Sequence, residues 1–330
     1  MSATVATNLP VLDLAPYMAG ETGAAEKIAA ELREINETIG FMTIIGHGVP
    51  AELTQATFEQ AARFHALPTE DKLAVKVNLQ MQGYLPMRGS TTRTSNLSTG
   101  NKPNENEAFF IKRGVNEDGD NDGRWPANLP GFRETALKYY DAMDDLAQKL
   151  LPLYALALNL PADYFADKCN DPMTGLRLTH YPPVEYGASQ FGIAPHSDSS
   201  FITLLAQNKV PGLQVKTPEG EWIDAEVIPN SFVVNTGDVL HRWSNGRFMS
   251  TPHRAFNTSQ GPRYAIPYFF HPNADTLLDC LPGCEVPGEA PRFPAMTTAE
   301  YQAWFRGRNY DHVRKEKGEA PEQAAPAAAE

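Results

Sequence analysis

The chain has 330 residues, with 40 Asp or Glu and 28 Lys or Arg, so its formal net charge is −12. This length suits one large or two average domains and allows a sizeable buried core. An acidic chain without basic blocks is a poor candidate for binding nucleic acid or an anionic membrane, and we expect neither as a partner.

Cysteine usage and the N-terminus indicate a cytoplasmic protein. The three cysteines cannot all pair within one chain and are few for this length, which fits a reducing compartment. The opening residues MSATVATNLP lack the basic and apolar regions of a signal peptide. The longest apolar stretch, residues 150–158, is interrupted by Pro152 and is too short to span a bilayer.

The first half of the chain is predicted to mix short strands with amphipathic helices. Apolar, β-branched and aromatic residues predict strands at 10–14 and 41–46. Apolar residues at helical spacing predict helices at 24–39, 52–65 and 132–158. Gly40 is expected to end the first helix in a left-handed conformation. The segment LPTEDK predicts a short helix with Thr69 as its N-cap.

Two long polar loops are expected, at 86–106 and 114–131. Long loops in compact domains often act as lids or binding loops. The acidic run at 118–123 imitates the start of a calcium-binding EF loop, but Leu129 stands where the bidentate Glu is needed. We therefore interpret this run as an acidic turn.

Beyond residue 172 the chain becomes a succession of short β-type runs separated by Pro, Gly and Asn turns. This pattern predicts an all-β sandwich or barrel, so the fold class is mainly β with flanking helices. Asn245-Gly246 predicts a hairpin, with His241 and Trp243 on the preceding strand. A last helix is expected at 298–306, and residues 315–330 form a low-complexity tail that we expect to be disordered.

The His196-Ser197-Asp198 sequence is the strongest candidate for chemistry. On an extended chain, residues i and i+2 point to the same face, so the imidazole and the carboxylate converge. His253 lies on another predicted strand. Two imidazoles and one carboxylate on one face of Fe(II) leave adjacent coordination positions open, as in non-haem Fe(II) oxygenases. Taken alone, a His-x-Asp motif is weak evidence, and structural histidines remain an open reading.

Arg263 adds a candidate binding group for an anion to this pattern. The residues 257–262 read as a turn, so His253 and Arg263 are expected on adjacent antiparallel strands. A buried guanidinium needs an anion, and a bidentate carboxylate is its natural partner.

The chain resembles the isopenicillin N synthase-like group of Fe(II)/2-oxoglutarate-dependent dioxygenases over about residues 9–310. The resemblance rests on segments that come in the family's order and spacing. They are PVLDL, GFMTIIGHGVP, LPTEDK, QGYLP, LRLTHYPP, PHSDSSFITLL, GLQV, VNTGDVLHRWSNGRFMSTPHR and RYAIPYFFHPN. The resemblance implies a double-stranded β-helix, or jelly roll. It also implies an enzyme that consumes 2-oxoglutarate and dioxygen, releases succinate and carbon dioxide, and oxidises a C–H bond of a small molecule by hydroxylation, desaturation or ring closure.

Carried over to this chain, the resemblance implies that His196, Asp198 and His253 bind Fe(II). Arg263 would pair with the distal carboxylate of 2-oxoglutarate, and Tyr181 would add a hydrogen bond. The chain departs from the family at two positions, because Ala265 stands where a Ser is usual and Thr179 where an Asn is frequent. The missing Ser hydroxyl removes one hydrogen bond to an anion, which is expected to weaken the binding of the co-substrate by about 1.5–3 kcal/mol.

Period-two alternation from Arg263 places Ala265 and Phe269 on the same strand face, with Ala265 near the co-substrate and Phe269 near the substrate. Arg88, Arg93 and Lys102 in the first polar loop are further candidates for contacting a substrate, although solvated loop charges are the simpler reading. The substrate and the oligomeric state leave no signal in the sequence.

The expected organisation is an N-terminal region at 1–130, a jelly-roll core with its C-terminal helix at 131–314, and the tail at 315–330. Two other functions stay open: an iron oxidase of the same fold that does not use 2-oxoglutarate, and a non-catalytic jelly-roll binding protein or zinc hydrolase. The absence of a His-Glu-x-x-His helix argues against the commonest zinc hydrolases.

Overall fold

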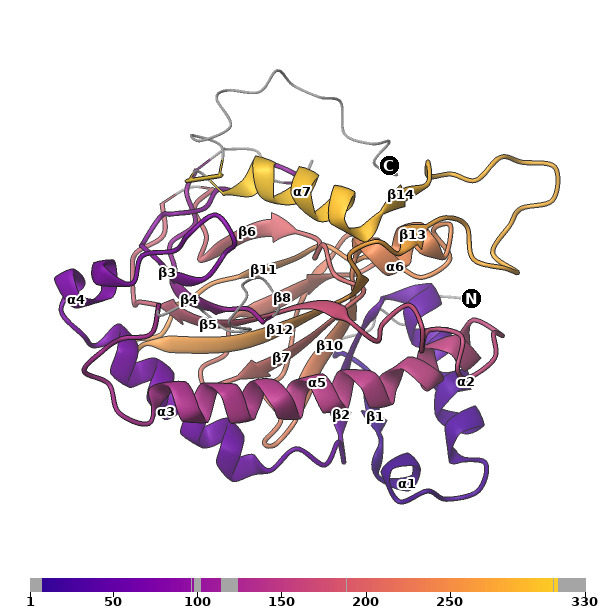
Figure 1. The fold of residues 1–330 in the computed structure, drawn as a ribbon, viewed down its shortest axis with the longest axis horizontal. Helices are drawn as coiled ribbons and strands as arrows, with labels where there is room; N and C mark the ends of the chain where they lie inside the picture. The colour runs from indigo at the N-terminus through magenta and orange to yellow at the C-terminus, as the bar shows by residue number, and fades with distance from the viewer. Residues whose placement is uncertain are drawn as a thin grey trace.

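The structure is a computed structural model that describes residues 8–95, 97, 102–113, 124–187, 189–310 and 312–313. Its centre consists of two β-sheets with a cavity between them, and helices lie outside (Figure 1). The acidic run at 118–123 and the tail at 315–330 fall outside the described residues.

The larger sheet has eight strands. In spatial order they are β1 (Val11–Asp13), β2 (Phe41–Ile45), β10 (Phe232–Thr236), β7 (Ile202–Gln207), β12 (Arg263–Asn273), β5 (Pro172–Tyr181), β4 (Glu107–Ile111) and β3 (Gly83–Leu85). Strands from the first 130 residues therefore form both edges of a sheet whose centre comes from later residues. The N-terminal region and the core share one sheet, and the boundary between them at residue 130 stays a prediction.

The smaller sheet has four strands, in the order β6 (Ile193–His196), β11 (His253–Ala255), β8 (Leu213–Lys216) and β9 (Trp222–Asp224). A separate pair is formed by β13 (Leu277–Leu278) and β14 (Met296–Thr297). Two facing, largely antiparallel sheets with helices outside confirm the predicted jelly-roll class.

Helices cover the outer face of the larger sheet. They are α1 (Ala15–Met18), α2 (Ala24–Thr38), α3 (Ala51–His65), α4 (Thr69–Ala74) and α5 (Phe132–Ala157), and two more follow, α6 (Asp238–Trp243) and α7 (Thr298–Asn309). In Figure 1, α5 lies below the strands and α7 above them. The α5 helix buries a stripe that includes Tyr140, Met143 and Leu150, as its helical apolar spacing predicts.

Alternate residues of strand β12 face either the cavity or the hydrophobic core. Arg263, Ala265 and Phe269 line the cavity between the sheets. The alternate residues Ile266 and Tyr268 pack into the main core, and the Tyr268 hydroxyl donates to Asp144 Oδ1 on α5 at 2.7 Å. The predicted period-two alternation is confirmed.

Four local predictions are wrong. First, His241 and Trp243 belong to helix α6 and not to a strand. Second, Asn245-Gly246 follows the end of this helix and makes no hairpin. Thr69 begins α4 without capping it, because its N-cap is Pro68. The fourth concerns β11 and β12, which are not adjacent strands but lie in different sheets. Asn257 holds the bend between them, since its side-chain amide donates to the carbonyls of Tyr181 and Gly261.

Gly40 follows α2 at φ +63°, as predicted, and its N–H donates to the carbonyl of Ile35. No helix among the described residues is both long and apolar enough to cross a membrane.

Candidate active site

His196, Asp198 and His253 meet where the smaller sheet faces the larger one. His196 ends β6 and His253 begins β11, and the two residues are directly paired across the sheet. The Nε2 atoms of His196 and His253 lie 3.8 and 3.7 Å from Asp198 Oδ1. Each residue offers one ligand atom, and the three atoms lie within 4.8 Å of one another, so they suit a single metal ion.

The remaining polar atoms of these three residues are held by neighbours. His196 Nδ1 donates to the carbonyl of Ala194 at 2.8 Å, and His253 Nδ1 donates to that of Thr251 at 3.2 Å. Both rings therefore present Nε2 to the shared space. Asp198 Oδ2 accepts hydrogen bonds from Thr203 and Asn235, which leaves Oδ1 for a metal. Hydrogen bonds of this kind orient metal ligands, so the residues fit an Fe(II) ion.

The protonation states also suit a divalent cation. Burial and the neighbouring His253 lower the pKa of His196 to about 3, so its imidazole is neutral near pH 7. Burial alone raises the pKa of Asp198, but the two histidines and the hydrogen bonds outweigh it and lower that pKa. Two imidazoles and one carboxylate form the donor set of a non-haem Fe(II) centre.

Arg263 reaches into the cavity between the two sheets, which we call the inner cavity. His196, Asp198 and His253, here called the triad, line it together with Tyr181, Arg263 and Ala265. Its side chain is 1% exposed and its guanidinium lies 4.8 Å from the centre of the Tyr181 ring. Nη2 donates to Gln207 at 3.2 Å, but Nε and Nη1 have no hydrogen-bond partner among the described residues. A buried cation with two unpaired N–H groups is costly unless an anion joins it.

Two more side chains line the inner cavity beside Arg263. Ala265 lies directly opposite Thr179 in the pairing of β12 with β5, and both are buried. Thr179 Oγ1 has no hydrogen-bond partner. Since a cross-strand pair points to one face, this hydroxyl lies next to the methyl group of Ala265.

A second cavity adjoins the triad on the side of α7, and we call it the outer cavity. His196, Asp198, Arg177, Phe269 and Arg306 are among its lining residues. Phe269 lines both cavities, so the structure places it between the two spaces. Arg88 and Arg93 do not line either one. The exposed Arg88 pairs with Glu105, and Arg93 donates to the carbonyl of Arg308. That Phe269, Arg88 and Arg93 contact a substrate stays a prediction.

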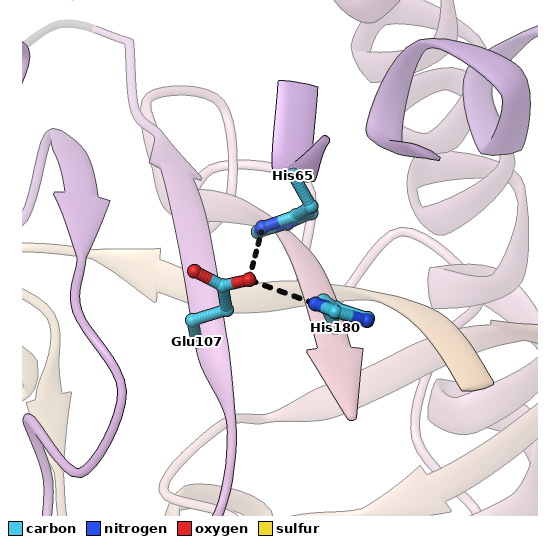
Figure 2. Close-up of side chains that lie close together, drawn as sticks. All are labelled: His65, Glu107 and His180. Carbon is cyan, nitrogen blue, oxygen red and sulfur yellow. Dashed lines mark hydrogen bonds and ion pairs between the residues drawn. The ribbon is translucent and has the colours of Figure 1, made fainter. Parts of the chain in front are cut away.

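A second group of two histidines and a carboxylate lies on the other face of the larger sheet (Figure 2). Glu107 Oε1 accepts from His180 Nδ1 at 2.8 Å and lies 3.4 Å from His65 Nδ1. Glu107 Oε2 accepts from Lys72 Nζ at 2.9 Å and from the Tyr84 hydroxyl. We call these five residues the Glu107 cluster.

The Glu107 cluster is a poorer iron site than the triad. The ammonium of Lys72 already neutralises the carboxylate, and a second cation beside it would be repelled. The 2.8 Å separation from His180 is that of a direct hydrogen bond. Neither cavity includes Glu107, His65 or His180 among its lining residues.

Some residues of the site had no predicted role. Arg177 lies on β5 two and four residues before Thr179 and Tyr181, so the same alternation could have placed it on the cavity face. Lys112 and Arg306 also line the outer cavity, but they come from the end of β4 and from α7. No local spacing in the sequence connects those two residues.

Comparisons with known proteins agree with this geometry. Residues 172–272 match the family described as the 2OG-Fe(II) oxygenase superfamily, and residues 9–130 match the non-haem dioxygenase in morphine synthesis N-terminal family. The 2-oxoglutarate-Fe(II) type oxidoreductase hxnY of Emericella nidulans is 34% identical, over 96% of this chain and 94% of that protein. The homoarginine-6-hydroxylase 2-ODD-C23.1 of Arabidopsis thaliana is 32% identical, over 86% of this chain and 90% of that protein.

The fold also matches a solved structure with the co-substrate bound. The crystal structure of full-length Neurospora crassa T7H in complex with alpha-KG and thymine has a TM-score of 0.80 and 29% identity, covering 89% of this chain and 94% of that one. The chain therefore belongs to the 2-oxoglutarate- and Fe(II)-dependent oxygenases and is an oxidoreductase that uses Fe(II), 2-oxoglutarate and dioxygen.

Proposed function

We propose that His196, Asp198 and His253 hold Fe(II) and that Arg263 binds the distal carboxylate of 2-oxoglutarate in the inner cavity. The observation that carries this proposal is the buried Arg263 guanidinium, whose Nε and Nη1 lack partners in the cavity that also contains the triad. A carboxylate is the anion that this planar fork pairs with best.

The residues around the centre position ligands and exclude water. The face of Tyr181 supports the guanidinium, while the side chains of Thr203 and Asn235 hold the carboxylate of Asp198. Fe(II), when bound, supplies the activation of dioxygen that couples the decarboxylation of 2-oxoglutarate to substrate oxidation. A closed, preorganised site keeps this chemistry away from bulk water.

The substrate in this proposal is a small molecule in the outer cavity, with Phe269 beside the C–H bond that is oxidised. Hydroxylation, desaturation and ring closure are all compatible with this arrangement. The proposal places the protein in the isopenicillin N synthase-like group and in the cytoplasm, acting on neither nucleic acid nor membrane, as the acidic composition suggests. It keeps residues 1–130 as the N-terminal region and 131–314 as the oxygenase core.

The first test concerns the metal. Wild-type protein prepared without oxygen should bind about one Fe(II) per chain, whereas Asp198→Ala should lose the iron and turnover while keeping its circular dichroism spectrum. Asp224→Ala, at an exposed position on β9, is the control and should bind iron normally. Normal iron content and turnover in Asp198→Ala would contradict the assignment of the triad.

The second test concerns Arg263. Arg263→Leu should weaken 2-oxoglutarate binding to the Fe(II) protein by about 2–3 kcal/mol, which is tens-fold to a hundredfold, in an anaerobic calorimetric titration. Arg63→Leu is the control, because Arg63 lies on the outer helix α3 and donates to Gln60 and to the carbonyl of Pro130. Unchanged affinity in Arg263→Leu would remove Arg263 from the co-substrate site.

A further inference from the structure

The outer cavity carries an excess of positive charge. Among the described residues that line it, Lys112, Arg177 and Arg306 are cationic, and the carboxylate is that of Asp198. Asp198 faces the metal position with Oδ1 and is held through Oδ2. Its charge is therefore committed to the iron in the proposed function.

Arg177 is placed to donate to a ligand. It comes from β5, is 7% exposed, and lies with its guanidinium 5.2 Å from the centre of the Phe110 ring. Nη2 donates to Asn106 Oδ1 at 2.8 Å, while the buried Nε has no partner. No carboxylate among the described residues pairs with it. An unpaired, buried guanidinium nitrogen on a cavity wall favours an anionic ligand.

Arg306 and Lys112 line the same cavity from two other elements. Arg306 Nε donates to the carbonyl of Gln302 within α7, and burial lowers the pKa of this arginine. Burial and the nearby Arg306 lower the pKa of Lys112 to about 7. The buried His271 on β12 has no partner at Nδ1, and burial, Lys112 and Arg306 lower its pKa to about 3. The positive charges of Lys112 and Arg306 therefore disfavour further protonation at this wall of the outer cavity.

The remaining walls are suited to an apolar body. Large apolar side chains also line the outer cavity: Met81, Phe110, Leu176, Phe269 and Phe305. A ligand that filled this space would place its anionic end at the cations and its hydrocarbon part near the metal.

We propose that the outer cavity binds a substrate with a carboxylate on an apolar or aromatic body, and that Arg177, Arg306 and Lys112 hold the carboxylate while a C–H bond faces the triad. This inference rests on the proposed function, since it names the substrate class of that same site. It replaces the predicted loop arginines Arg88 and Arg93 with cations that line the outer cavity as the residues that recognise charge.

The test compares acids with their neutral amides. Benzoate, phenylacetate and 3-phenylpropionate, and the primary amide of each, are titrated by calorimetry into protein loaded with Fe(II) and 2-oxoglutarate without oxygen. At least one acid should bind about tenfold or more tightly than its amide, because charge-assisted hydrogen bonds to arginine are lost in the amide.

Variants on α7 assign this preference to the cavity. Arg306→Gln should reduce the preference for acid over amide to about twofold or less, whereas Arg306→Lys should keep most of it. Arg308→Gln is the matched control, because Arg308 lies on the same helix against Trp304 and does not line the cavity. The affinity for 2-oxoglutarate should be the same in all three variants.

The inference is overturned if amides bind wild-type protein as tightly as acids, if none of the six probes binds, or if Arg306→Gln keeps the full preference. These outcomes are separate from a failure of the proposed function. If the proposed function were wrong, 2-oxoglutarate itself would not bind, or its affinity would not depend on Arg263, whether or not the acids bind.

Discussion

Thr179 and Ala265 lie at the proposed co-substrate site and are the two positions where the chain departs from the residues usual in the family. The resemblance predicted weaker binding of 2-oxoglutarate because Ala265 lacks the usual Ser hydroxyl. The structure places the unpaired hydroxyl of Thr179 directly opposite Ala265, on the same cavity face. A hydroxyl from the neighbouring strand can therefore donate where the Ser hydroxyl is missing.

This arrangement predicts opposite effects of two substitutions. Thr179→Val keeps the side-chain volume but removes the donor, so the affinity for 2-oxoglutarate should fall by about 0.5–1.5 kcal/mol. Ala265→Ser adds a donor and should tighten binding by a similar amount. Anaerobic titration of the Fe(II) protein measures both. Equal affinities in wild type, Thr179→Val and Ala265→Ser would show that the distal carboxylate lies away from this pair.

Lys112 should make carboxylate binding dependent on pH. Its pKa is about 7, lowered by burial and by Arg306 on α7, whereas His271 on β12 has a pKa of about 3 and stays neutral. As the pH rises from 6 to 8.5 the ammonium loses its proton, so the affinity for an acid such as phenylacetate should fall. Binding should also take up protons near pH 7.5, because the anion raises the pKa of Lys112.

Calorimetry of acid binding at pH 6, 7 and 8.5 in buffers of different ionisation enthalpy measures both effects. Lys112→Met should remove most of the pH dependence and the proton uptake. A wild-type affinity that is constant across this range would show that Lys112 does not contact the carboxylate.

At the scale of elements, the sequence predicted those features that depend on local pattern. The alternation on β12 correctly placed Arg263, Ala265 and Phe269 on one face. The pattern could not show that His253 pairs directly with His196, because that register depends on two strands 57 positions apart in the chain. It also misassigned β11 and β12 as neighbours, since one bend at Asn257 sends the chain from one sheet to the other.

Helix α6 shows tertiary context overriding local propensity. Its residues DVLHRW follow a strand and include β-branched and aromatic side chains, and this pattern predicts His241 and Trp243 on a strand. In the structure, Asp238 begins the helix and accepts from Ser250 and Tyr301, and the N–H of Asp238 donates to the carbonyl of Asp198. The short helix thus supports the segment that carries Asp198, the proposed iron ligand, through contacts that lie far apart in sequence.

The N-terminus of α7 should control the wall of the outer cavity. Thr297 and Glu300 form a reciprocal capping box, with Thr297 Oγ1 accepting from the Glu300 N–H and Glu300 Oε2 accepting from the Thr297 N–H. Thr297→Ala should destabilise the helix by about 1 kcal/mol. Because α7 carries Gln302, Phe305 and Arg306, the acid probe should bind more weakly while 2-oxoglutarate binding stays unchanged.

Thr38→Ala is the control for this variant, since Thr38 is exposed at the end of α2 and bonds only within its own helix among the described residues. It should leave the binding of both ligands unchanged. Weaker 2-oxoglutarate binding in Thr297→Ala, to the same extent as acid binding, would indicate a general loss of structure.

At the scale of the whole molecule, the Glu107 cluster joins the N-terminal helices to the central sheet. His65 comes from α3, while Glu107 and His180 come from neighbouring strands of the sheet (Figure 2). Lys72 comes from α4. His65 Nε2 also donates to the carbonyl of Leu178 at 3.0 Å. The cluster is buried, so the removal of one charge leaves the others without a partner.

The pKa shifts in this cluster predict a loss of stability in acid. Burial lowers the pKa of His65 below 6.5, so the unfolded chain binds a proton there that the folded chain does not, and stability falls as the pH drops below 6.5. Burial alone raises the pKa of Glu107, but hydrogen bonds from His180 and Tyr84 outweigh it and lower the pKa below 4.5. Its contribution is complete above pH 4.5 and is lost at lower pH.

Glu107→Gln should therefore unfold more easily at neutral pH and respond less to acid. The substitution leaves the buried ammonium of Lys72 without its carboxylate, which should lower the free energy of unfolding at pH 7 by about 3–5 kcal/mol. Urea titrations at pH 7, 5.5 and 4 measure this, and the loss of stability below pH 4.5 should be smaller in the variant than in wild type. Glu37→Gln breaks the exposed pair with Arg247 and should cost about 0–1 kcal/mol at every pH. If Glu107→Gln cost no more than Glu37→Gln, the cluster would contribute nothing to holding the helices on the sheet.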